Sequence, residues 1–111
     1  MALTMTRTRT QTALAKLVEV LARVNGELAF VREVRVEAPA HREVLRAREV
    51  QLERERGALC TTIRQFNPEL DPEEVGSLDD WWPGRRPKTR AGMVRRHLEV
   101  TSRGSKRDAA R

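Results

Sequence analysis

Hydrophobic residues recur in steps of three and four along the first third of the chain. The positions that keep this spacing are Leu14, Leu17, Leu21, Val24, Leu28 and Val31, and we call them the leucine–valine seam. A helix gathers such positions on one face, whereas a strand cannot bury them on one side. The seam therefore predicts a coiled-coil-like helix. We also expect it to form the interface between copies of the chain, most simply as a four-helix dimer.

The helix is expected to begin near residue 9. Thr8 and Gln11 fit a Thr-x-x-Gln capping box, and residues 1–8 are expected to be flexible. Further apolar residues lie beside the seam at Val18, Val20, Phe30 and Val34. The apolar arc is therefore broader than one partner helix can cover, so another surface should pack there.

Gly26 lies inside this helix and costs about 1 kcal/mol relative to Ala. It marks either a close approach of another element or a tolerated defect.

A second helix is predicted from about Pro39 to residue 66. Leu45, Leu52, Leu59 and Phe66 follow at seven-residue intervals, and the charge run between them is typical of a solvated helix face. Proline disrupts a continuous helix, and the two helices have matched lengths, so residues 9–66 favour an antiparallel hairpin with a corner at Pro39. The alternative is one long rod kinked at the proline.

The rest of the chain is expected to hold shorter elements. Asp71-Pro72-Glu73-Glu74 is typical of a helix start, so a short helix is predicted over 72–82, ending at Trp82-Pro83-Gly84 and closing the open end of the hairpin. An extended basic linker, an amphipathic helix over 89–101 and a disordered end should follow. The predicted class is all-α, with a hairpin at 9–66, a short helix and stop at 67–84, and a basic tail at 85–111.

Composition and charge support an elongated helical protein with a basic end. Of 111 residues, 34% are charged and 4% aromatic, which leaves little material for a thick core. The net charge of +6 is uneven. Residues 1–84 carry 12 basic and 14 acidic residues, whereas residues 85–111 carry 10 basic and two acidic ones. A concentrated positive segment attracts polyanions.

Three interpretations of the basic tail remain open. It binds DNA or RNA phosphates, or it contacts an acidic protein or membrane surface, or it only improves solubility. For the first, the expected contacts are Arg85, Arg86, Lys88, Arg90, Arg95 and Arg96. No helix-turn-helix or basic-zipper pattern accompanies them, so they would position nucleic acid without reading bases.

Little in the sequence suggests catalysis. Cys60 is expected to be a buried thiol more than a reactive one, and His41 and His97 lack neighbours at metal-ligand spacing. No cofactor, metal or enzyme activity is predicted. The pair Trp81 and Trp82 is either a buried anchor or a surface for base stacking or a partner's hot spot.

A single cysteine and the lack of an apolar run long enough to span a bilayer favour a cytoplasmic protein. The acid-poor residues 1–18 leave a mitochondrial presequence as an alternative. The sequence thus predicts a non-enzymatic helical scaffold that self-associates and binds nucleic acid. Its alternative is a structural or adaptor protein that binds a partner through the apolar face of the hairpin. No motif is specific enough to name a family.

Overall fold

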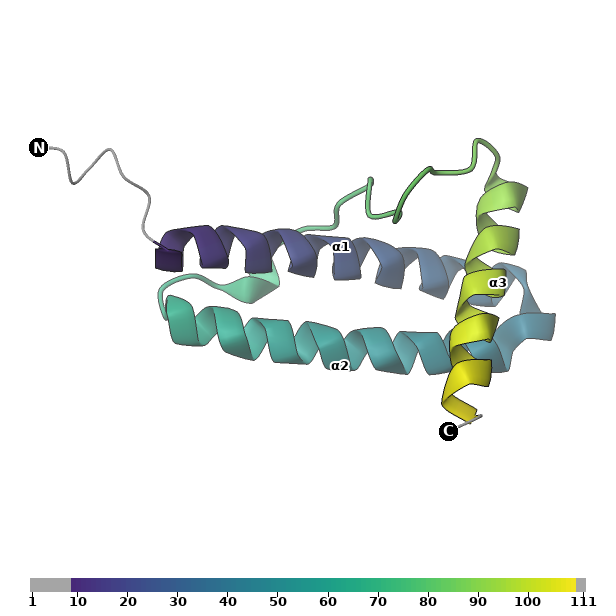
Figure 1. Cartoon of the computed structure of the whole chain (residues 1–111), viewed down its shortest axis with the longest axis horizontal. Helices are drawn as coiled ribbons and strands as arrows, with labels where there is room; N and C mark the ends of the chain where they lie inside the picture. Colours follow the sequence, from purple (N-terminus) through teal and green to yellow (C-terminus); the bar gives the residue numbers. More distant parts are fainter. Residues whose placement is uncertain (1–8, 110–111) are drawn as a thin grey trace, which may run out of the picture.

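The computed structural model describes residues 9–109. Two long helices, α1 (Arg9–Glu37) and α2 (Arg42–Phe66), form an antiparallel hairpin, and a third, α3 (Arg90–Ala109), crosses it near its closed end (Figure 1). The predicted all-α fold with a long helical hairpin is confirmed. The alternative of one kinked rod is wrong, because the chain reverses at the proline.

The corner is built from the backbone around Pro39. The amide of Ala38 donates to the carbonyl of Val34 (2.7 Å), and the 3-10 turn η2 (Pro39–His41) then redirects the chain. Proline has no amide proton to donate, so it suits the first position of such a turn and cannot continue α1. The reversal therefore follows from the local sequence.

The leucine–valine seam lies between α1 and α2 of the same chain. Leu21, Val24, Leu28 and Val31 are buried, while Leu14 and Leu17 are half-buried toward the open end. From α2 the buried partners are Leu45, Leu52, Cys60 and Ile63. Burying an aliphatic side chain of this size contributes about 1.5–3 kcal/mol, so this seam is the main source of hairpin stability.

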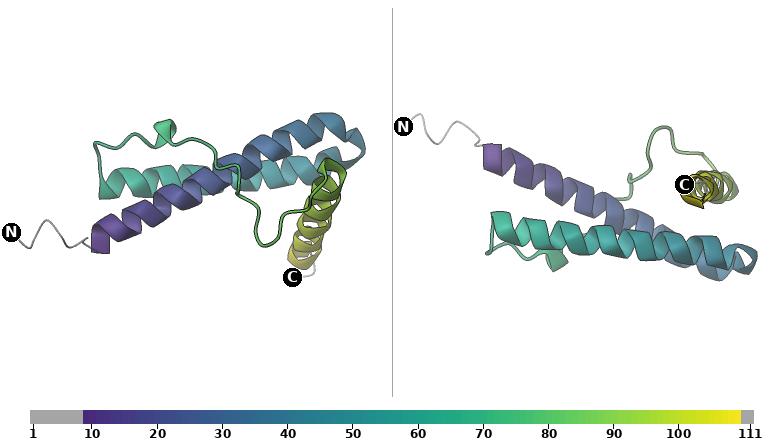
Figure 2. Two further views of the ribbon diagram at one scale, coloured as in Figure 1. Left: turned by 90° about the horizontal axis from the view of Figure 1, so that it is seen from above. Right: turned by 60° about the horizontal axis from the view of Figure 1, so that its bottom comes forward.

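Residues 67–89 run back along the hairpin from its open end toward its closed end (Figure 2). The helix predicted over 72–82 is present only as the 3-10 turn η3 (Pro72–Glu74), whose amide at Glu73 donates to Oδ1 of Asp71 (3.0 Å). At Val75 the backbone is already extended. The amide of Leu78 then donates to the carbonyl of Ala22 in α1 (2.9 Å). Binding to α1 therefore replaces the helical hydrogen bonds that the sequence pattern predicted.

α3 begins where Thr89 caps it: the amide of Gly92 donates to the Thr89 hydroxyl (3.0 Å). The amphipathic helix predicted over 89–101 is confirmed in type and is longer than expected. Residues 102–109, predicted to be disordered, continue the helix. The predictions of a flexible N-terminus at 1–8 and of a capping role for Thr8 lie outside the described residues.

The broad apolar arc of α1 is covered by the chain itself. Phe30 and Val34, on the side of α1 away from the seam's centre, are buried in one cluster with Trp82 and Met93. Val94 and Leu98 of α3 pack against the same cluster. The extra surface that the sequence required is therefore supplied by the returning segment and α3.

Candidate nucleic-acid interface

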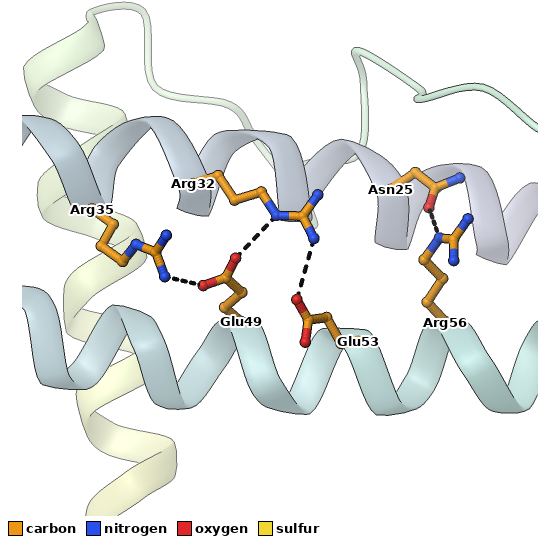
Figure 3. A network of polar contacts seen from close by, with 6 residues as sticks. All are labelled: Asn25, Arg32, Arg35, Glu49, Glu53 and Arg56. Carbon is orange, nitrogen blue, oxygen red and sulfur yellow. Dashed lines mark hydrogen bonds and ion pairs between the residues drawn. The ribbon is translucent and has the colours of Figure 1, made fainter.

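Arginines of the hairpin are held by carboxylates on neighbouring elements. Figure 3 shows Arg32 of α1 reaching across to two acids of α2, with Nε 3.0 Å from Glu49 and Nη2 3.2 Å from Glu53. Arg35 also binds Glu49, and Arg56 donates to Oδ1 of Asn25 (3.1 Å). The positive charges of Arg32 and Arg35 are therefore compensated within the fold, and all three arginines link α1 to α2.

A partly buried polar triad joins all three helices. Glu27 of α1 accepts two hydrogen bonds from Arg48 of α2, at 2.6 and 2.7 Å, and its Oε2 lies 2.9 Å from Nε2 of His97 in α3. Burial raises the pKa of Glu27, but hydrogen bonds to His97 and Arg48 outweigh it and lower this pKa to about 2. The residue pattern alone did not predict this triad. The sequence feature that could have indicated it is Glu27, an acid within the apolar arc.

Trp81 and Trp82 lie in an aromatic joint with Phe30 and His97. The ring centroid of Phe30 is 5.3 Å from those of both Trp81 and His97, and the two indole centroids are 5.1 Å apart. Trp82 is 7% exposed and His97 is 6% exposed. Of the two roles considered for the tryptophan pair, this packing favours the buried anchor, which attaches residues 81–98 to α1.

Arg90 lies on the inward face of α3. Its Nη2 is 3.1 Å from Glu33 and 3.0 Å from Glu37, and its guanidinium stands 5.1 Å from the centroid of the Phe30 ring. Two carboxylates of α1 therefore already compensate the charge that was expected to meet a phosphate. We assign Arg90 to the attachment of α3 and not to the phosphate-binding surface.

The other five predicted contacts are exposed and form no ion pair with a described residue. We call them the tail cations: Arg85, Arg86, Lys88, Arg95 and Arg96. The first three lie in the irregular segment after Gly84, which bends at Arg85 and Lys88. Gly84 itself has a positive φ of 75° that suits glycine. Arg95 and Arg96 lie on the outward face of α3, as does Glu99, which reduces the positive potential there.

The seam residues expected to form an oligomer interface are used inside the single chain. The four central ones are at most 8% exposed, and the rest of the arc packs against α2, the returning segment and α3. Self-association and partner binding were both inferred from an uncovered apolar face. That reason for expecting a dimer or an adaptor no longer holds.

Among the residues that the structure describes, no helix is long and apolar enough to cross a membrane, and no cluster of three or more His, Cys, Asp or Glu side chains suits a metal ion. Cys60 is a buried free thiol. No family model, curated protein or solved structure matches the chain.

Proposed function

We propose that this chain is a non-enzymatic helical scaffold that binds the phosphates of nucleic acid through the tail cations. The observation that carries the proposal is the contrast between two sets of cations. Arg32, Arg35 and Arg48 of the hairpin are bound to carboxylates, whereas the tail cations are exposed and form no ion pair with a described residue. Free guanidinium and ammonium groups release condensed counterions when they meet a phosphate backbone, and this release drives binding.

The attachment of α3 supports the proposal. The aromatic joint and the Glu27 triad fix α3 on the hairpin, so Arg95 and Arg96 are presented from a helix that packs against the rest of the fold. A rigid display lowers the entropy lost on binding. Contacts from the tail cations to phosphate carry no base information, so affinity is expected to depend on charge and to vary little with sequence.

The test is a salt titration of binding to duplex DNA and to single-stranded RNA, measured by fluorescence anisotropy. Two double variants, R85Q/R86Q and R95Q/R96Q, each remove two tail cations. The control R54Q/R64Q removes two exposed α2 arginines that form no ion pair with a described residue, so all three lose the same charge.

Each phosphate contact on duplex DNA contributes about 0.9 to the slope of log K against log salt, so five contacts give up to about 4.5. Each tail variant should lower this slope by about 2, and the control should leave it nearly unchanged. A wild-type chain that binds neither nucleic acid would refute the proposal. So would a control that lowers the slope as much as the tail variants do.

A further inference from the structure

A surface pocket of about 480 Å³ lies at the closed end of the hairpin, far along the chain from the tail cations. Its lining residues are Arg35 and Val36 from the end of α1, and Arg42 and Arg46 from the start of α2. We call it the bend pocket. Three of its four lining side chains carry a guanidinium, and none carries a carboxylate. Such a concentration of one sign of charge in a hollow favours an anion.

Arg35 is held in place by an acid outside the pocket lining. One terminal nitrogen of its guanidinium binds Glu49, which is 8% exposed and also accepts from Nε of Arg32 (3.0 Å), as Figure 3 shows. Glu49 thus binds two arginines, and Glu53 also binds Arg32. Arg35 is therefore fixed in position through one terminal nitrogen, and its other nitrogens form no further ion pair with a described residue.

Arg42 and Arg46 supply the other two cations. They are four residues apart on α2, so they share one face, and both are exposed and form no ion pair with a described residue. The acid at the end of α1, Glu37, is bound to Arg90. No carboxylate in the described part of the chain neutralises these two side chains through an ion pair.

We infer that the bend pocket binds the phosphate or pyrophosphate group of a small soluble ligand. A guanidinium donates two parallel hydrogen bonds to phosphate oxygens, and three of them from two helices can surround one anionic group. The pocket volume of about 480 Å³ is large enough for a phosphate or pyrophosphate group. This inference does not rest on nucleic-acid binding, because its residues lie on different elements from the tail cations.

The experiment is a titration of the full chain, labelled with nitrogen-15, with sodium phosphate and then sodium pyrophosphate at constant ionic strength. Binding should saturate, should be tighter for pyrophosphate, and should shift the Nε–H signals of Arg35, Arg42 and Arg46. The variant R42Q/R46Q should bind pyrophosphate roughly tenfold more weakly or worse, as expected for lost charge-assisted contacts. The control R54Q/R64Q loses the same charge from the same helix and should bind within about twofold of wild type.

Both replaced arginines are exposed, so far-ultraviolet circular dichroism should show unchanged helicity, and the single variants R42Q and R46Q should each give part of the loss. Three results would overturn the inference. The first is that wild type shows no saturable binding of pyrophosphate. The second is that R42Q/R46Q and R54Q/R64Q lose affinity for pyrophosphate equally. The third is that the chain binds vesicles containing phosphatidic acid but binds neither phosphate nor pyrophosphate in solution. Any of these leaves the DNA and RNA salt titrations unaffected, so the two proposals fail separately.

Discussion

One methyl group at Gly26 tests how the returning segment packs on α1. A Cβ atom at this position would lie 2.4 Å from the backbone oxygen of Leu78 and 2.7 Å from Cδ1 of Trp81. Gly57, in α2, has nothing within 4 Å of the same point. Because both glycines lie inside long helices, G26A and G57A add the same group to the same kind of backbone and differ only in what that group meets.

The two variants are expected to change the free energy of unfolding in opposite directions. Alanine is more favourable than glycine in a helix by about 0.8–1 kcal/mol, so G57A should raise the free energy of unfolding by about that amount. G26A has the same gain, but overpacking costs about 1–3 kcal/mol. The obstacle at Gly26 is a backbone carbonyl, and the neighbouring Leu78 amide is itself bonded to Ala22, so the cost should be near the upper end. A net loss of about 2 kcal/mol follows, and the variants should differ by about 3 kcal/mol.

Urea unfolding followed by circular dichroism measures these free energies. Tryptophan emission should report the same transition in G57A, because both indoles lie in the aromatic joint. In thermal unfolding, 1 kcal/mol corresponds to about 4–8 °C for a domain of this size, so the midpoints should differ by more than about 10 °C. If G26A were as stable as G57A, residues 78–81 would not lie against α1, and the described position of the tryptophans would be wrong.

Two further predictions concern the attachment of α3. The lowered pKa of Glu27, about 2 against 4.5, implies that its ionised form contributes about 3 kcal/mol above pH 4.5, and that this contribution is lost as the pH falls toward 2. The difference in unfolding free energy between wild type and E27Q should therefore be largest near neutral pH and shrink below pH 4.5 in urea titrations; a difference independent of pH would contradict it. R90Q removes two exposed ion pairs worth about 0.2–1 kcal/mol each, so it should lower the unfolding free energy by about 1 kcal/mol, and a loss above about 3 kcal/mol would show that this account is incomplete.

The hairpin could be predicted because its signals are local. Seven-residue spacing of leucines, the proline at residue 39 and matched helix lengths each act over a few residues, and they agree with one another. The helix expected over 72–82 fails for the opposite reason. Asp71 and Pro72 do start a turn, but hydrogen bonding of Leu78 to Ala22, 56 positions earlier, holds the following backbone extended. No short-range pattern can report such a partner.

The residues of the candidate interface also differ in whether local sequence or long-range packing determines their position. Exposure of Arg85 and Arg86 follows from a proline-interrupted, basic segment, which sequence reasoning identifies directly. The inward position of Arg90 depends on where Glu33 and Glu37 lie after folding, and the basic lining of the bend pocket depends on α1 and α2 meeting at the corner. The broad apolar arc of α1 correctly predicts that another surface packs on it. The sequence pattern does not show that residues 81–98 of the same chain supply that surface.

The position of α3 makes the order of synthesis important for folding. His97 contacts Glu27, 70 residues earlier, so the apolar side of α1 is completed by some of the last described residues to leave the ribosome. At about 5–20 residues per second, residues 67–98 take roughly 2–6 s to synthesise. During that interval the nascent hairpin exposes Phe30 and Val34 to other proteins. Chaperone capture and mispairing between neighbouring nascent chains are therefore expected to concentrate on this intermediate.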